Sequence, residues 1–201
     1  MMLVEETAPP AEALPVAGLR AHLRLGSGFA GGVDAAEDAA LASFLRAAIA
    51  AIEARTGKVL LRRRFRMRIE DWREPECQPL PLAPVASVDE VVVTDRRGVE
   101  RAVEAEAWRL VPDNQRPLLR GAGLSLPVVP AGGFVTITFT AGFGSGWEAI
   151  PPDLAHAVIL LAAQYHDDRG AAGLGAALPF PVAALIERWR AVRVLTGRVA
   201  R

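Results

Sequence analysis

The chain has 201 residues, 51% hydrophobic and 23% charged, a composition typical of a soluble globular protein with one sizeable core. Its 23 basic and 23 acidic residues balance, which predicts neither broad affinity for nucleic acid nor attraction to anionic membranes. The single cysteine, Cys77, excludes an intrachain disulfide and any metal site built from several cysteines. No apolar run reaches the ~20 residues that a membrane helix needs, so we expect a cytoplasmic protein without a membrane segment.

The first part of the chain is predicted to be helical. Residues Met1–Pro10 carry two glutamates where a secretory signal would be basic and then apolar, so we expect a flexible lead-in there. A short helix is predicted over Pro15–Leu25. A longer helix begins after Asp34, a favourable N-cap, and keeps the 3.6-residue apolar period until Gly57, which suits a left-handed C-terminal cap.

After Leu60 the apolar period changes from 3.6 to 2, which predicts an extended strand with two unlike faces. One face is apolar, with Leu61, Phe65, Met67 and Ile69, and the other carries a row of Arg62, Arg64, Arg66 and Arg68. Four aligned guanidinium groups repel one another unless acidic groups or phosphates compensate them. Three explanations stay open for this arginine row: pairing within the sheet to Glu70, Glu100 or Glu104, or simple solvation; acidic surface on a neighbouring subunit; or DNA.

Further short strands follow in the middle of the chain, after prolines that interrupt pairing before Val88. They are predicted over Val88–Thr94, Val99–Val103, Trp108–Val111, Leu118–Arg120 and Phe134–Thr140. The turn-like Asp95–Gly98 joins the first two in a hairpin. These strands indicate a small antiparallel sheet.

The helical period returns near the end of the chain. A helix starting at Pro151 has almost no polar side, so it must be buried within this subunit or between subunits. Pro179 and Pro181 open a last helix before a basic C-terminus. The fold class is α+β, a helical bundle with an inserted small antiparallel β-sheet subdomain. We divide the single domain into N-terminal helices (1–57), a β-rich insertion (58–145), and C-terminal helices with a tail (146–201).

No pattern predicts a catalytic, cofactor or metal site. The glycine-rich Gly142–Gly146 follows a strand and precedes a helix, but it lacks the dinucleotide and Walker spacings, so we interpret it as a flexible connection. His156 and His166 are too far apart on one helix to ligate a metal as a pair. His166 adjoins two aspartates without a nucleophile in any recognisable motif, and this cluster is the basis of one alternative, a small hydrolase.

Several motifs, in order, resemble the phage head-tail connector family, which includes the adaptors of phage-derived gene transfer particles. The first group is Asp38, Leu41, Ile49, Ala51, Ile52-Glu53 and Thr56-Gly57, followed by Trp72 and the Leu80–Val88 segment. The second group is Phe139–Gly144, Ile150-Pro151, Leu154, Ala157-Val158, Tyr165 and Arg169. The sequence departs from the family at the glycine-rich residues 26–32 and in the loop 170–177.

The resemblance implies a non-enzymatic structural subunit of a ring, commonly of twelve copies, between the portal and the tail. Its expected partners are the portal protein, neighbouring copies of itself, and a downstream stopper or tail-completion protein. DNA would pass through the ring without sequence-specific binding, and the protein would move from the cytoplasm during assembly to the neck of the particle. The arginine row is the candidate subunit interface. The candidate portal-binding residues are Trp189, Arg190, Val192, Arg193, Val194, Leu195 and Arg198.

A second alternative is a nucleic-acid-binding packaging accessory that uses the arginine row. It predicts steeply salt-dependent DNA binding by isolated subunits, which a connector does not require.

Overall fold

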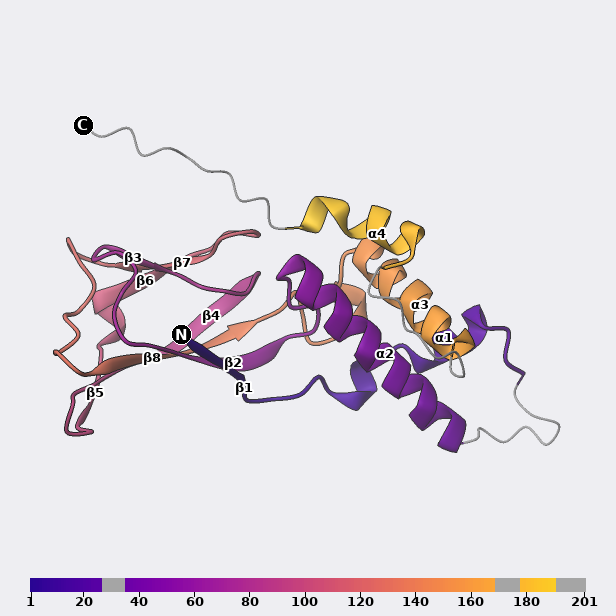
Figure 1. Cartoon of the computed structure of the whole chain (residues 1–201), viewed down its shortest axis with the longest axis horizontal. Helices are drawn as coiled ribbons and strands as arrows, with labels where there is room; N and C mark the ends of the chain where they lie inside the picture. The colour runs from indigo at the N-terminus through magenta and orange to yellow at the C-terminus, as the bar shows by residue number, and fades with distance from the viewer. Residues whose placement is uncertain (27–34, 169–177, 191–201) are drawn as a thin grey trace.

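The computed structural model describes residues 1–26, 35–168 and 178–190, with the helices gathered at one end and the strands at the other (Figure 1). The helices are α1 (Val16–His22), α2 (Ala35–Thr56), α3 (Pro152–Asp167) and α4 (Phe180–Ile186), and α4 continues into a 3-10 turn, η4 (Glu187–Trp189). The strands are β1 (Met2–Glu5), β2 (Arg63–Ile69), β3 (Cys77–Pro79), β4 (Val85–Thr94), β5 (Glu100–Ala102), β6 (Trp108–Val111), β7 (Leu118–Gly121) and β8 (Phe134–Ala141). This arrangement confirms the predicted α+β class.

The helices enclose the first of two hydrophobic cores. Helix α2 buries one stripe, represented by Leu45 and Ile52, against α3, which buries Leu154, Val158 and neighbouring residues. The apolar helix predicted from Pro151 is therefore buried within its own subunit over much of its surface. The predicted cap at Gly57 is confirmed, because this glycine ends α2 with a φ of 67°. Asp34, the expected N-cap, lies outside the described residues.

The strands form two antiparallel sheets where the sequence predicted one. The larger has the order β1-β2-β8-β4-β5, and the smaller has the order β3-β7-β6. The hairpin predicted at Asp95–Gly98 is confirmed: the Asp95 carboxylate accepts hydrogen bonds from the backbone N–H groups of Arg97 and Val99, and Gly98 has a φ of 83°. Side chains from both sheets, such as Phe139 and Leu119, enclose the second core.

Two segments differ from the expectations. The expectation that Met1–Pro10 is a flexible N-terminal segment is wrong, because Met2–Glu5 forms β1. This strand pairs with residues 65–68 of β2 at the edge of the larger sheet. The prolines before Val88 do not prevent pairing either, since β3 ends at Pro79 and pairs with β7.

The glycine-rich stretch after β8 is a close-packed junction between the two cores. A Cβ at Gly142 would stand 2.5 Å from the Cα of Arg62, and Gly142 has a φ of 128°, so glycine is required here. The backbone N–H of Gly142 donates to Pro84, and the N–H of Arg62 donates to the carbonyl of Gly144. The segment after β8, which was expected to be a flexible connection, is therefore held in place by backbone hydrogen bonds between the sheet and the helices.

Candidate functional site

Arg64, Arg66 and Arg68 of the arginine row lie on β2, Arg62 comes directly before it, and the predicted alternation is confirmed. Arg64, Arg66 and Arg68 are exposed, whereas the intervening side chains are buried against the second core. Pairing with β8 places threonines beside them: Arg64 faces Thr140, and Arg66 faces Thr138. The row thus covers one open face of the five-stranded sheet.

Two arginines of the row share one carboxylate. The Nε atoms of Arg64 and Arg66 lie 3.2 Å and 3.1 Å from the two carboxylate oxygens of Glu6, and Asp89 lies 3.9 Å from Arg64. Both arginine side chains are about half exposed, so each pair contributes only about 0–1 kcal/mol to stability. The charge of this part of the row is compensated within the subunit.

The other two arginines differ from each other. The guanidinium carbon of Arg68 stands 3.5 Å from the centroid of the Phe134 ring, a cation–π contact. Arg62 is exposed and makes no ion pair with the residues that the structure describes. From the sequence, Glu70, Glu100 or Glu104 were the expected partners within the sheet. The ion pairs of the row are instead made by Glu6 and Asp89, because the strand order brings β1 and β4 close to the row.

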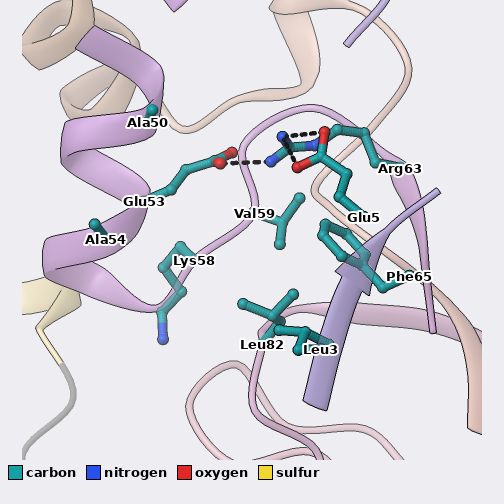
Figure 2. Close-up of a pocket in the computed structure, with 10 residues that line it drawn as sticks. All are labelled: Leu3, Glu5, Ala50, Glu53, Ala54, Lys58, Val59, Arg63, Phe65 and Leu82. Atoms are coloured by element: carbon teal, nitrogen blue, oxygen red, sulfur yellow. Dashed lines mark hydrogen bonds and ion pairs between the residues drawn. The ribbon is translucent and has the colours of Figure 1, made fainter. Parts of the chain in front are cut away.

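A fifth arginine, Arg63, forms a buried charge cluster that the sequence analysis missed (Figure 2). Its guanidinium donates to Glu53 of α2 at 2.5 Å and to both carboxylate oxygens of Glu5 at 3.0 and 3.1 Å. The Arg63 side chain is only 6% exposed and that of Glu53 is 15% exposed. Because Arg63 is in phase with the apolar residues of β2, the period of 2 already placed it on the buried face, and this was the signal that could have revealed it.

The environment of Glu53 opposes its ionisation. Burial raises the pKa of Glu53, and the Arg63 charge together with the hydrogen bond from the Leu60 N–H, at 2.7 Å, partly offsets that rise. The cluster therefore joins three segments, β1, α2 and the start of β2, at the junction between the two cores.

The single lysine of the sequence is also buried beside this junction. Lys58 is 1% exposed, and its ammonium donates to the side-chain oxygen of Gln115 at 2.7 Å. Burial lowers the pKa of Lys58, and the charge of Asp113 opposes the change. The side chain anchors the loop around Asp113 and Gln115 to the end of α2.

An open cleft of about 370 Å³ lies next to these groups, between β1 and the C-terminal half of α2. Its walls combine apolar and charged side chains, and Figure 2 shows Glu53 and Arg63 bonded to each other along one side. The lining residues are Leu3, Glu5, Ala50, Glu53, Ala54, Lys58, Val59, Arg63, Phe65 and Leu82.

The C-terminal candidates are only partly described. Trp189 packs edge-on against Phe143 with ring centroids 5.7 Å apart, and its Nε1 donates to Asp153 at 2.6 Å. Burial acts to raise the pKa of Asp153, but hydrogen bonds from Trp189 and Arg188 outweigh it, and the net effect lowers the pKa. Trp189 is thus held on its own subunit, and Arg190 pairs with Glu187 at 3.1 Å. The other candidates, Val192, Arg193, Val194, Leu195 and Arg198, lie outside the described residues.

The residues singled out for catalysis do not form a reactive site in the described part of the chain. The ring of His166 bonds to Asp167 at 3.2 Å and meets Phe44 edge-on, and no described serine or cysteine is hydrogen-bonded to it. Burial raises the pKa of Cys77, which makes its thiol less reactive. Within residues 1–26, 35–168 and 178–190 there is no cluster of three potential metal ligands, and no helix is long and apolar enough to span a membrane.

Comparison with known proteins gives a consistent set of structural relatives. A scan against protein-family models and a search of curated proteins found no match. Among solved structures, the chain is 58% identical to a chain from the neck of an empty gene transfer agent particle, computed with C6 symmetry, with a TM-score of 0.88. It is 58% identical to a chain of a native gene transfer agent virion and 54% identical to one of a native neck computed with C12 symmetry, with TM-scores of 0.85 and 0.82. Each alignment covers 98% of this chain and 100% of the other.

Full-length identity of this size, with the α+β fold described above, defines a structural protein of a virion neck. The chain belongs to the phage head-tail connector (adaptor) family, which includes the adaptors of gene transfer agents. The resemblance drawn from the sequence motifs is confirmed.

Proposed function

We propose that the chain is an adaptor subunit that forms a ring, of twelve copies, between the portal and the tail of a gene transfer particle. The observation that carries this proposal is the full-length, 58% identical match to a chain from the neck of such a particle. The C6 and C12 symmetries named for the related necks support a copy number of twelve, which fits both. The closed cyclic symmetry of such a ring requires each subunit to contact two neighbours through two different surfaces.

The binding partners of the subunit follow from the position of the ring between portal and tail. One side of the ring meets the portal protein and the other meets a stopper or tail-completion protein, while DNA passes through the centre without sequence-specific contacts. Compensation of Arg64 and Arg66 by Glu6 supports passage rather than binding, because paired guanidinium groups are less available to phosphates. Assembly takes place in the cytoplasm, and the finished ring resides in the neck of the particle.

The direct test is deletion of the gene in a particle-producing strain. We expect DNA-filled heads without tails in electron micrographs, and full recovery of tailed particles when the wild-type gene is supplied in trans. Normal tailed particles in the deletion strain would refute the proposal.

The portal-binding role belongs to the chain after Arg190. Residues 191–201 contain three arginines, no acidic residue and several apolar residues, which suits a cleft with acidic groups on the portal. Truncation before Val192 removes this segment but leaves α4 and the Trp189 contacts. We expect a folded, soluble protein whose filled heads fail to join tails. Transfer-competent particles at normal titre would contradict the portal-binding role.

The arginine row is proposed as a subunit interface. The ion pairs of the row are exposed, and each is worth about 0–1 kcal/mol. The free energy of unfolding of the double variant Arg64→Ser, Arg66→Ser should therefore lie within about 1–2 kcal/mol of the wild-type value. We expect this variant to impair particle assembly, whereas Glu6→Gln, which removes the intrachain partner and keeps both arginines, should assemble. Normal assembly of the double variant would show that the arginine row is not part of the subunit interface.

A further inference from the structure

Strand β1 presents an open edge of the larger sheet. The Glu6 N–H donates to the Arg64 carbonyl at 2.8 Å, which fixes the alternation of hydrogen-bonded pairs along β1 and β2. Met2 and Val4 therefore direct their backbone groups to β2, while Leu3 directs its N–H and C=O away from the sheet. None of the strands in the described residues pairs with that outer side of β1.

The side chains at this edge are unusual for a strand that faces water. Met2, Leu3 and Val4 are 56%, 36% and 37% exposed, although exposed edges are ordinarily blunted by charged residues or proline. Leu3 also lines the open cleft against α2, so the edge and the cleft form one continuous surface (Figure 2). An apolar strand edge with free backbone donors and acceptors suits the addition of another strand.

Among the strands that the structure describes, none pairs with the outer side of the opposite edge, β5, either. Strand β5 is exposed along all three of its residues, and Val99 before it is 62% exposed. Because every pairing in the order β1-β2-β8-β4-β5 is antiparallel, β1 and β5 run in the same direction. A rotation about an axis along the strands thus brings β5 of one copy beside β1 of the next in a parallel pairing.

We propose that β1 of each subunit pairs with β5 of the adjacent copy in the ring. The inference rests on the proposed ring and specifies its subunit contact. A second copy is the occupant because a ring needs two unlike complementary surfaces on each subunit, and the two open edges of one sheet meet that requirement. The side chains of Leu3 and Arg101 share one face of the sheet, since they stand opposite Met67 and Val93, which both point into the second core.

Disulfide trapping tests the pairing. In a Cys77→Ser background, Leu3→Cys combined with Arg101→Cys places two thiols on the same face of the joined sheet. The matched control combines Leu3→Cys with Ala102→Cys, which moves the second thiol to the other face. In purified, oxidised particles we expect a ladder of covalent multimers for the first pair and at least tenfold less for the control.

Two results would overturn the pairing without touching the proposed function. The first is normal incorporation of the Leu3→Cys, Arg101→Cys protein that stays monomeric under oxidation. The second comes from Leu3→Pro, which removes only the outward N–H and leaves the ladder to β2 intact, with Leu3→Ala as its control. We expect Leu3→Pro to fold and to lose at least tenfold in incorporation, whereas Leu3→Ala incorporates; equal incorporation of both would refute the pairing. Absence of the wild-type protein from particles would instead overturn the proposed function and the pairing together.

Discussion

Replacing Arg63 with methionine isolates the energetic role of the buried charge cluster. Methionine keeps an unbranched side chain but removes the guanidinium, whose central carbon lies 5.5 Å from the centroid of the Phe65 ring, and it leaves the Glu53 carboxylate without its cation in a site that is only 15% exposed. Removing one partner of a buried ion pair costs about 3–5 kcal/mol, because the remaining charge stays desolvated. The Leu60 N–H still bonds to Glu53, so we expect the lower end, about 3 kcal/mol.

The matched control is Glu5→Gln. Glu5 also bonds the buried Arg63, but the Glu5 side chain is 40% exposed and Arg63 keeps its bond to Glu53 when Glu5 is replaced, so we expect a smaller loss of about 1 kcal/mol. Both free energies are measured by urea denaturation at pH 7, followed by circular dichroism. A loss below about 1 kcal/mol for Arg63→Met would refute the assignment of a buried, energetically coupled pair.

The stability lost in Arg63→Met should also depend on pH. Burial raises the folded-state pKa of Glu53, and loss of the Arg63 charge raises it further, so the penalty is fully present above that pKa. As the pH falls through it, the carboxyl group takes up a proton and the penalty is relieved. The stability difference between wild type and Arg63→Met should therefore narrow from pH 7 toward pH 5. The stability difference between Glu53→Gln and the double variant Arg63→Met, Glu53→Gln should not change over this pH range. If that difference narrows too, a titratable group other than Glu53 causes the effect.

Three further predictions concern the junction and the 3-10 turn η4. Gly142→Ala should lower the free energy of unfolding by more than about 2 kcal/mol, from strain and the clash with the Arg62 backbone, whereas Gly123→Ala, with open space around it, should change it by less than about 0.5 kcal/mol. Burial lowers the folded-state pKa of Lys58, so the wild type should gain stability relative to Lys58→Met as the pH rises toward the unfolded value of 10.5, measured by urea denaturation. Trp189→Phe removes the donor to Asp153 and should cost about 1.5 kcal/mol, seen as a lower Tm.

The elements that sequence periodicity predicted well are those whose own residues decide their structure. Helix α2 and the alternation in β2 follow from the spacing of apolar residues, and the Asp95–Gly98 turn follows from the preferences of those two residues. In each case the local pattern and the tertiary environment agree. The helices Ala35–Thr56 and Pro152–Asp167 and the presence of strands between them could therefore be predicted without the structure.

The elements that the sequence did not predict depend on a distant partner. Strand β1 has four residues and only one β-branched side chain, and it exists because β2, some 60 positions later, offers it a paired edge. The Arg63 cluster likewise unites residues 58 and 10 positions apart. The second sheet depends on β3 reaching β7, a pairing that the prolines near it concealed. No local period carries such information.

The buried cluster and the open edge are physically linked, because Glu5 is at once the last residue of β1 and a partner of Arg63. Arg63 is bonded to α2 through Glu53, so the edge strand is tied to the helical core through charged hydrogen bonds as well as to β2 through its backbone. Loss of Arg63 should therefore loosen β1 before it unfolds the sheet. In Arg63→Met, amide hydrogen exchange at Val4 should speed up more than at Ile137 in the centre of the sheet; equal acceleration at both positions would mean that the cluster stabilises the subunit without holding the edge in place.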